Sequence, residues 1–406
     1  MRRRCGVELH GSAVPGGEAF DDLLRAFTVQ HGVAGAALAV GRAGVIEYAR
    51  SIGWADIDQQ IPVEPHSLFR IASLSKPVTA VAILQQVECG ALSLEGLVWE
   101  LLKLDTPHDV RWKQVTIRHL LQHTGGWDRK ASFDPMFRSV EFAAEAGTPP
   151  PADPSAIIRA MLRRPLDFDP GKQYAYSNFG YCLLGRVLES LPGAQGKSYQ
   201  QLVREQILTP VGALSPRIGR TLTPQVDEVR YYMPMTGDRV REDSVFAPGT
   251  PVNPPYGAWC LETMDSHGGW ISSAPDMVRF AMGCDLPLEA GSVNPTSKRP
   301  FLLNAASIAS LWAEPVSYPR QDPDMWYACG WNVRRAGSGE GRNTWHLGAL
   351  DGTSTLLVRR WDGMTWCILF NQRKNVAGDE LARLIDPLLH PAANQAYAAL
   401  QARSGH

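Results

Sequence analysis

The chain of 406 residues has no long uninterrupted apolar run and no strong excess of charge of either sign. Residues 1–10 are partly basic, but no apolar segment follows them, so we expect neither a signal peptide nor a membrane-spanning helix. The formal net charge is −1, so no bulk field favours nucleic acid or an anionic membrane surface. These absences predict a cytoplasmic protein without nucleic-acid partners, unless the sequence starts downstream of an export signal.

Cysteine is sparse and follows no recognisable pattern. The seven cysteines are odd in number, and no Cys-x-x-Cys occurs, so we expect neither a disulfide framework nor a structural zinc site. This usage suits a reducing compartment. Cys89, Cys182 and Cys367 stand in apolar surroundings, which predicts that they are small core residues.

Signatures of several other enzyme classes are also missing. The absence of Gly-x-Ser-x-Gly argues against an α/β-hydrolase. Leu191 stands where a phosphate-binding loop ending at Gly196-Lys197-Ser198 would need its first glycine. His119 and His123 have the spacing of a zinc helix, but the required glutamate does not follow His119. We therefore expect no metal and no cofactor.

One serine does precede a lysine at the spacing of a catalytic pair. Ser73-Leu74-Ser75-Lys76 leads into the apolar residues 77–84, which predicts a buried helix. Positions three apart share a helix face, so the Lys76 amine can reach the Ser73 hydroxyl and activate it. Lys76 can act as a base only while it is neutral, which burial would favour. Taken alone, the pattern equally fits an ordinary helix start with a solvated lysine.

Two later motifs favour the catalytic interpretation. Tyr176-Ser177-Asn178 is the only Tyr-x-Asn in the sequence, and His346-Leu347-Gly348 follows it. His-x-Gly occurs three times, so the order along the chain has to decide among them. The copy at His123 precedes Tyr176, and the copy at His267 opens a Gly-Gly-Trp stretch, which leaves His346 as the third motif.

In this order and at this spacing, the three motifs resemble those of the serine β-lactamase and penicillin-recognising superfamily. The closest resemblance is to its branch of class C β-lactamases, DD-peptidases, D-aminopeptidases and family VIII carboxylesterases. It extends over residues 20–389 and includes the linking stretches 116–126 and 268–277.

The resemblance implies a role for each motif residue. Ser73 would be the nucleophile and Lys76 its base, while Tyr176 would relay the proton to the leaving group. Asn178 would orient Lys76 and bind the acyl side of the substrate. His346 would lie on the far wall of the cleft, facing Ser73. The other possibilities are a packed aromatic pair for Tyr176, a helix cap for Asn178 and a packed strand residue for His346.

The strand that carries the third motif would also contribute its backbone to the site. Gly348 would let the substrate approach that backbone closely. The backbone N–H groups of Ser73 and Ala349 would form an oxyanion hole, which is often the largest single contribution to the rate.

The hydrophobic pattern predicts strands at both ends of the chain and helices between them. Residues 18–31 repeat as an amphipathic helix, residues 36–49 form a β-hairpin, and residues 73–89 form the nucleophile helix. A second hairpin is expected over residues 353–370 and a closing helix over residues 379–389.

This pattern, together with the resemblance, predicts an α+β, β-lactamase-like fold. A central antiparallel sheet would be built from both chain ends and flanked by helices. The predicted division is a sheet domain of residues 18–90 and 260–395, a mostly helical insertion domain of residues 91–259 carrying Tyr-x-Asn, and tails of residues 1–17 and 396–406. The aperiodic residues 215–260 and 285–300 are expected to cover the active-site face.

The third motif guides the expected substrate. β-Lactamases of the family carry Lys-Thr-Gly, whereas this chain has His346 in place of the lysine and Leu347 in place of the hydroxyl residue. A fixed cation and a hydroxyl, both suited to a substrate carboxylate, are therefore lost. We expect a serine hydrolase that forms an acyl-enzyme, most of all a carboxylesterase or amidase on small ester, amide or peptide substrates.

Alternatives remain open at this stage. D-Ala-D-Ala carboxypeptidase, D-aminopeptidase or β-lactamase activity would use the same motifs. An alternative of another class is a non-catalytic β-lactamase-like binding protein. The sequence leaves the oligomeric state open.

Overall fold

The computed structural model describes residues 8–234, 240–286, 292–315, 322–337 and 341–404. Nine of the strands in this part of the chain join one antiparallel sheet. They span Leu9–His10 (β1), Gly35–Arg42 (β2), Val45–Asp56 (β3), Ile61–Pro62 (β4), Met325–Tyr327 (β10), Asn332–Arg335 (β11), Arg342–Leu350 (β12), Thr353–Arg359 (β13) and Thr365–Phe370 (β14).

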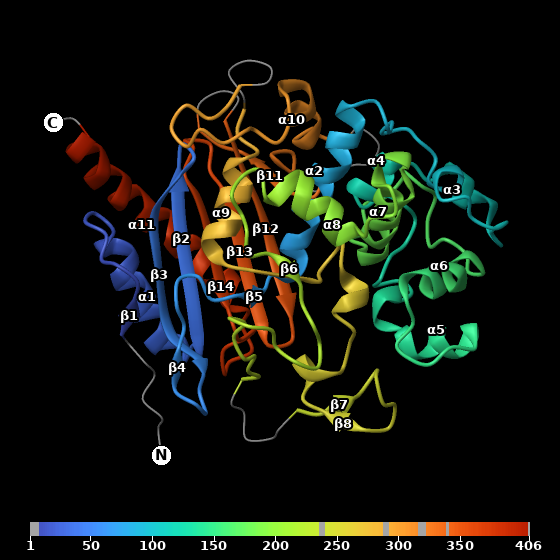
Figure 1. Ribbon diagram of the computed structural model, residues 1–406, viewed down its shortest axis with the longest axis horizontal. Helices are drawn as coiled ribbons and strands as arrows, with labels where there is room; N and C mark the ends of the chain where they lie inside the picture. Colours follow the sequence, from blue (N-terminus) through green and yellow to red (C-terminus); the bar gives the residue numbers. More distant parts are fainter. Residues whose placement is uncertain (1–7, 235–239, 287–291, 316–321, 338–340, 405–406) are drawn as a thin grey trace.

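The strand order is β1-β3-β2-β14-β13-β12-β11-β10, with β4 paired to β3. The N-terminal strand β2 therefore lies directly beside the C-terminal strand β14, shown as blue beside red in Figure 1. Both predicted hairpins are present, as β2–β3 and β13–β14. The prediction of a central antiparallel sheet built from both chain ends is confirmed.

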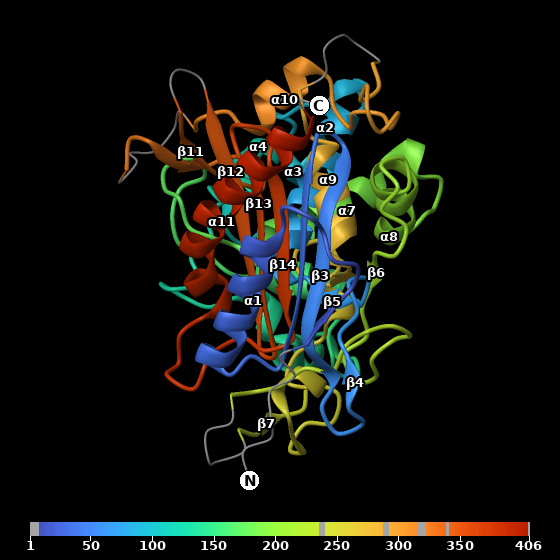
Figure 2. The same ribbon diagram turned by 90° about the vertical axis from the view of Figure 1, so that its left-hand side faces the viewer.

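The central strands separate two apolar cores. In β14, Trp366, Ile368 and Phe370 belong to one core, while Cys367 and Leu369 belong to the other. Successive side chains of a strand point to opposite faces, so this alternation means that both faces of the sheet are covered. Helices α1 (Glu18–His31) and α11 (Leu381–Ser404) cover one face, and α9 (Ala274–Met282) covers the other (Figures 1 and 2).

The predicted helix over residues 18–31 coincides with α1, but the closing helix is longer than predicted. Helix α11 continues past Pro387 and Pro391, both of which lie inside it. A proline in a helix interior costs about 3 kcal/mol. Side chains of α11 as far along as Ala396 are buried in the core against the sheet, and this packing offsets the cost. Residues 396–404, expected as a tail, are therefore helical.

The N-terminal end also contains more regular structure than expected. Strand β1, at residues 9 and 10, pairs with β3 at the edge of the sheet, although residues 1–17 were expected as a tail. The basic residues 1–7, which include Cys5, lie outside the described residues.

The remaining helices mostly gather on the side of the molecule away from α1 and α11 (Figure 1). They span Ser75–Glu88 (α2), Val98–Leu101 (α3), Ile117–Leu121 (α4), Ser139–Ala146 (α5), Pro154–Leu162 (α6), Asn178–Ser190 (α7), Tyr199–Val203 (α8) and Ala305–Leu311 (α10). Phe69–Arg70 (β5), Arg217–Ile218 (β6) and Trp270–Ser272 (β9) form a small sheet, and Glu242–Asp243 (β7) pairs with Pro251–Val252 (β8). The described part of residues 91–259 therefore contains α3 to α8 together with the short strands β6, β7 and β8.

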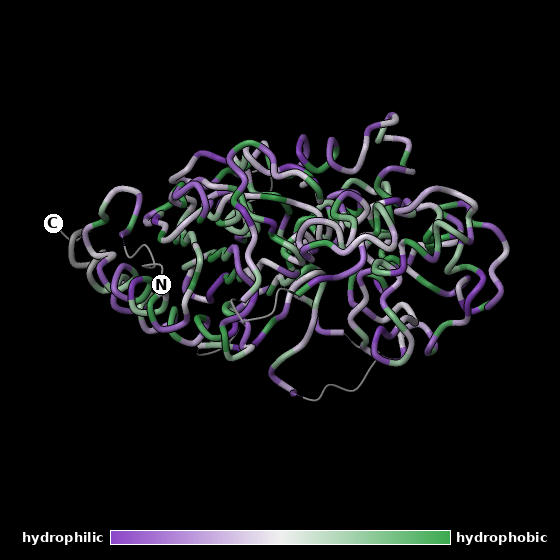
Figure 3. Tube along the Cα trace, turned by 90° about the horizontal axis from the view of Figure 1, so that it is seen from below, coloured by the Kyte–Doolittle hydropathy of each residue, from purple (hydrophilic) through white to green (hydrophobic). Residues whose placement is uncertain are grey.

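None of the described helices combines the length and the apolar character needed to cross a membrane. Figure 3 shows apolar and hydrophilic residues interleaved along the chain without a long apolar tract. Cys182 and Cys367 are buried, as expected, but Cys89 is exposed. It is the C-cap residue of α2, and Gly90 turns the chain immediately after it with a φ of 76°, so the helix has already left the core at this point.

A buried arginine joins the segment before the nucleophile to the loops around it. The Arg70 guanidinium donates to the backbone carbonyls of Pro255 at 2.6 Å, Arg220 at 3.0 Å and Thr221 at 3.1 Å. Glu228, also fully buried, lies 3.5 Å from it. The positive charge is thus satisfied by one carboxylate and three carbonyls, and it ties the 220–255 segment to the end of β5.

Replacing Arg70 by alanine should therefore reduce the free energy of unfolding by about 3–5 kcal/mol, because it removes the ion-pair partner of the buried Glu228 carboxylate. Urea unfolding followed by circular dichroism measures the change. The matched control is Arg25→Ala, which removes an exposed arginine from an ion pair with Asp22 and should change stability by less than about 0.5 kcal/mol. Equal effects of the two substitutions would contradict the prediction.

Candidate active site

Ser73 lies in a 3₁₀ turn, η1 (Ala72–Leu74), immediately before α2. The predicted helix over residues 73–89 therefore begins two residues later than expected, with Ser73 just outside its first turn. Ala72 has a φ of 48°, in the left-handed region, which costs an alanine about 1–2 kcal/mol. The nucleophile candidate thus sits beside a strained residue, as is common at functional sites.

Strand β13 holds the chain that enters this turn. The Thr353 hydroxyl donates to the carbonyl of Arg70 at 2.9 Å, and the Thr355 hydroxyl donates to the carbonyl of Ile71 at 3.0 Å. These side-chain bonds fix the backbone immediately before Ala72, so the sheet supplies the restraint that the strained turn needs.

Lys76 is fully buried and has three polar neighbours. Its Nζ lies 3.0 Å from Ser73 Oγ, 2.8 Å from Asn178 Oδ1 and 2.9 Å from the backbone carbonyl of His267. The two carbonyl oxygens can only accept hydrogen bonds. A neutral amine has two N–H groups and one lone pair, so both hydrogens point to the carbonyls and the lone pair points to the Ser73 hydroxyl. This is the geometry of a general base.

The surroundings also favour the neutral form of this amine. Burial lowers the pKa of Lys76 well below its usual value, and the positive charge of Arg129 lowers it further. The Asp134 carboxylate opposes this shift and raises the pKa. Burial therefore moves the pKa of Lys76 in the direction that a general base needs.

Asn178 is held between Lys76 and a carboxylate that no motif indicated. It is the first residue of α7, but Ser177 is the N-cap and accepts the Gly180 N–H at 3.3 Å, so the Asn178 side chain does not cap the helix. Asn178 Nδ2 donates to Asp134 Oδ2 at 2.7 Å. Asp134 lies in a loop without sequence periodicity, and its position gave no signal in the sequence.

Tyr176 lies beside both members of the pair. The Lys76 Nζ is 4.7 Å from the centre of its ring. Burial raises the pKa of Tyr176, and a hydrogen bond with the Ser73 side chain opposes that shift. The phenol is therefore protonated near neutral pH and lies within hydrogen-bond reach of Ser73. It can donate its proton to a group in the site, but it does not lose that proton to water near neutral pH.

His346 is buried behind the cleft and held by two contacts. Its Nδ1 is 2.6 Å from the carbonyl of Leu347, and its Nε2 is 3.1 Å from the Tyr327 hydroxyl. A carbonyl can only accept, so we assign the proton to Nδ1 and the Tyr327 hydroxyl as donor to Nε2. Burial, reinforced by the charge of Lys76, lowers the pKa of His346 to about 3. The imidazole therefore stays neutral over a wider pH range than that of a histidine of ordinary pKa.

All three His-x-Gly histidines surround Lys76, although the order along the chain selected only one. His267 gives its carbonyl to Lys76, and the His123 ring lies 4.3 Å from the ring of Tyr176. Burial, with Lys76 as a second cause, lowers the pKa of both. His123 Nδ1 accepts the Ser177 N–H at 3.2 Å. His119 instead takes part in the capping box of α4, in which its side chain accepts the backbone N–H of the N-cap residue Thr116. Among the described residues, no group of three or more side chains is placed to hold a metal ion.

Gly348 brings strand β12 against the nucleophile turn. A Cβ added to it would lie 2.4 Å from the Ile71 carbonyl, 2.2 Å from Thr355 Oγ1 and 3.2 Å from the Ser73 backbone nitrogen. The place of a side chain at this residue is filled by the Thr355 hydroxyl of β13 and by the Ile71 carbonyl just before η1. The absence of a side chain at Gly348 therefore allows β12 to pack closely against η1. This close packing places the following residue, Ala349, beside Ser73.

Leu347 lies on the face of β12 that is turned away from Ser73. It packs against the core under α1 and α11, because strand residues alternate and His346 and Gly348 occupy the other face. It therefore does not make the edge of the cleft more apolar.

Ser73, Asn178 and Ala349 line one cleft of about 610 Å³. Trp259, from the loop region expected over the site, lies on its wall. The remaining lining residues are Ala72, Arg129, Phe137, Met264, His267, Gly268, Leu350, Asp351 and Arg373. The nucleophile candidate is thus accessible, while Lys76 and His346 are buried behind it.

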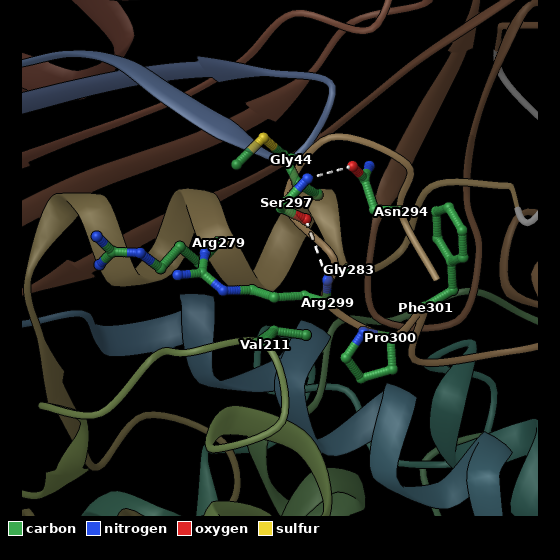
Figure 4. Close-up of a pocket in the computed structure, with 10 residues that line it drawn as sticks. Gly44, Val211, Arg279, Gly283, Asn294, Ser297, Arg299, Pro300 and Phe301 are labelled. Carbon is green, nitrogen blue, oxygen red and sulfur yellow. Dashed lines mark hydrogen bonds between the residues drawn. The ribbon is translucent and has the colours of Figure 1, made fainter. Parts of the chain in front are cut away.

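The second loop region expected over the site lies elsewhere. Asn294 and Arg299 line a separate pocket of about 260 Å³, with Gly44 of the β2–β3 turn and Arg279 of α9 (Figure 4). This pocket shares no lining residue with the cleft at Ser73. Residues 287–291 of the predicted region lie outside the described residues.

A model of the beta-lactamase family matches residues 20–389. The chain belongs to this family. Its fold is the predicted β-lactamase-like one.

Two relatives and one solved structure show the range of the beta-lactamase family around this chain. The probable fimbrial assembly protein FimD, serogroup H1, of Dichelobacter nodosus is 29% identical over 280 residues, covering 68% of this chain and 63% of that protein. Esterase EstB of Burkholderia gladioli is 32% identical over 189 residues, covering 43% and 44%. The D-amino acid amidase of Ochrobactrum anthropi SV3, solved with L-phenylalanine amide, matches with a TM-score of 0.69 and 19% identity over 96% of this chain and 99% of that one. The chain spans less than two thirds of the two relatives, whereas the solved structure shares its fold over nearly the full length.

Gly348→Ala should destabilise the protein by about 1–3 kcal/mol, the usual cost of an added group in a packed region, and should abolish labelling of Ser73. The added methyl must displace η1, because backbone and threonine atoms already fill its place. Thermal unfolding and labelling by a fluorophosphonate probe measure the two effects. Gly90→Ala, where a side chain would meet nothing, is the control for stability and should cost only the strain of its positive φ. Normal labelling of the Gly348→Ala variant would show that β12 need not approach so closely.

Proposed function

We propose that this beta-lactamase-family hydrolase forms an acyl-enzyme on Ser73 and acts on small ester or amide substrates. The observation that carries the proposal is the arrangement of Lys76. Its two carbonyl partners leave the lone pair of the neutral amine aimed at Ser73 Oγ, 3.0 Å away, at the wall of an open cleft.

In the proposed reaction, Ser73 Oγ attacks the carbonyl carbon of the substrate while its proton moves to Lys76 Nζ. The backbone N–H groups of Ser73 and Ala349 stabilise the oxyanion. Tyr176 delivers its proton to the leaving oxygen or nitrogen and takes the proton held by Lys76 in its place, and the bond from the acyl carbon to the leaving atom breaks. Water then attacks the acyl ester on Ser73 and gives a proton to the neutral Lys76, which passes it to Ser73 Oγ as the ester bond breaks, so the free hydroxyl returns and the acid is released.

The proposed preference for neutral substrates rests on the third motif, although Arg129 also brings a positive charge to the cleft wall. His346 brings no cation to the position where β-lactamases of the family have a lysine, because its imidazole is neutral. Arg373 lines the cleft, but it pairs with Glu380 at 2.8 Å and faces Asp351 at 3.4 Å, so its charge is offset. Esterase EstB is named for ester substrates, which supports esterase activity over β-lactamase activity.

A specific observation also supports a second candidate, D-aminopeptidase activity. The Asp351 carboxylate lies on the cleft wall, two residues after Ala349, where it could receive the ammonium group of an amino-acid amide. The solved D-amino acid amidase is named for such substrates. Comparing D-phenylalanine amide with its N-acetyl derivative separates the candidates, since an aminopeptidase should strongly prefer the free amine.

Ser73→Ala should abolish turnover, and Lys76→Ala should lower kcat by about a hundredfold or more, because one removes the nucleophile and the other its base. A p-nitrophenyl ester assay measures both, and a fluorophosphonate probe should label the wild type at Ser73. Lys298→Ala removes a lysine outside the cleft and should retain full activity. A wild type that the probe does not label would favour the non-catalytic binding protein, and near-normal rates without Lys76 would make that lysine merely structural.

Short p-nitrophenyl esters should be better substrates than a chromogenic cephalosporin, each corrected for spontaneous hydrolysis. His346→Lys should shift kcat/KM toward the cephalosporin by about tenfold to a hundredfold, because an ammonium beside a carboxylate retains roughly 1–3 kcal/mol after desolvation. Leu347→Thr is the matched control and should leave the ratio unchanged, since that side chain packs on the other face of the sheet. A ratio that the lysine does not move would show that this strand does not set substrate choice.

A further inference from the structure

Asp134 lies outside the three motifs, in the loop between α4 and α5. It is the N-cap of the short 3₁₀ helix η3 (Pro135–Phe137), and its Oδ1 accepts the Met136 N–H at 3.1 Å. Its other oxygen, Oδ2, accepts Asn178 Nδ2 at 2.7 Å. The two carboxylate oxygens therefore have separate partners, one that holds the loop and one that faces the site.

The direction of the Asn178 amide decides what Lys76 can do. In the observed direction, Oδ1 accepts from Lys76 and the lone pair of the neutral amine remains free for Ser73. An amide can rotate by half a turn with almost no change of shape. In that reversed direction, Nδ2 would donate to the amine and occupy the lone pair that Ser73 needs.

We propose that Asp134 is a positioning residue that fixes the direction of the Asn178 amide and so keeps the lone pair of Lys76 on the Ser73 hydroxyl. An ionised carboxylate can only accept, so it binds Nδ2 and excludes the reversed amide. The chain of donors and acceptors then has one polarity, from Lys76 Nζ through the amide to the carboxylate. This inference rests on the proposed function, in which Lys76 is the base.

Asp134 also acts on Lys76 through its charge. Its negative charge favours the ammonium form and opposes the effect of burial. Because only the neutral amine is a base, the acylation rate rises with pH as Lys76 loses its proton. Removing the negative charge should therefore move this rise to lower pH, and bringing a negative charge closer should move it to higher pH. The other titratable or charged groups that face Lys76 are Arg129, Tyr176, Tyr181, His123, His267 and His346.

The test uses two variants of the full chain and the pH dependence of Ser73 acylation by a p-nitrophenyl ester, followed as the pre-steady-state burst. Asp134→Asn keeps a good N-cap for η3 but presents an NH₂ group to Asn178, so the amide should reverse. We expect the plateau rate to fall by about tenfold to a hundredfold and the rise to move to lower pH.

The double variant Asp134→Asn/Asn178→Asp exchanges the two groups. The amide now at position 134 can donate to one oxygen of the carboxylate at position 178, while the other oxygen accepts from Lys76, so a group that can only accept again faces the lysine. We expect the plateau rate to recover by about tenfold over the single variant, a coupling within the range of contacting residues. The rise should lie at higher pH than in the wild type, because the carboxylate now contacts Lys76 directly.

The matched control is Asp153→Asn. Asp153 caps α6 through the Ala156 N–H at 2.7 Å, in the same way that Asp134 caps η3, but it is exposed. Its substitution should change neither the plateau nor the pH of the rise.

The outcomes separate the two proposals. If the wild type shows no burst and no labelling of Ser73, the proposed function fails and the inference fails with it. If the wild type acylates but Asp134→Asn keeps the wild-type plateau and pH profile, only the role of Asp134 is overturned. A folded Asp134→Asn protein that loses rate without a pH shift, and that the exchange does not rescue, would reduce Asp134 to a loop anchor and would also overturn the inference.

Discussion

The site depends on the burial of one amine. In the proposed mechanism Lys76 is the base, which requires that the fold remove its amine from water and still give its hydrogens two carbonyl acceptors. These acceptors come from separate places, the start of α7 and the turn before β9, while Ser73 comes from η1. A shift of any of these elements would either expose the amine or leave it without partners. The proposed chemistry of Ser73 therefore depends on the packing of these three segments.

The features that could be predicted from the sequence are those that local residue patterns indicate. The apolar pattern predicted both hairpins, and the first two motifs contain the side chains of Ser73, Tyr176 and Asn178 that lie beside Lys76. Asp134 was not predicted, because its partner, Asn178, is distant in sequence and because its loop has no periodicity. The spacing could not predict the left-handed Ala72, since strain there depends on hydrogen bonds from β13. Helix α11 continues past the predicted end at residue 389, and its packing against the sheet extends as far as Ala396.

The third motif illustrates how sheet geometry divides a short sequence. His346 and Gly348 share the face toward Ser73, but the first is neutral and bound to Tyr327, and the second is bare so that η1 fits. Leu347 belongs to the opposite core. The three adjacent residues therefore have separate roles. His346 sets the polarity beside the site, Gly348 allows the close approach of η1, and Leu347 stabilises the opposite core. A comparison of the motif sequence alone would not separate these roles.

The pairing of β2 with β14 has a consequence for how the active protein is made. Residues 36–41 pair with residues 365–370, and the hydroxyls that restrain the nucleophile turn belong to Thr353 and Thr355. During synthesis, Ser73 leaves the ribosome long before these partners do. The growing chain therefore carries Ser73 and Lys76 without the sheet that positions them, and the proposed reactivity would arise only when the last strands close the sheet. Such distant pairing also makes folding slow, since long loops must close before their contacts form.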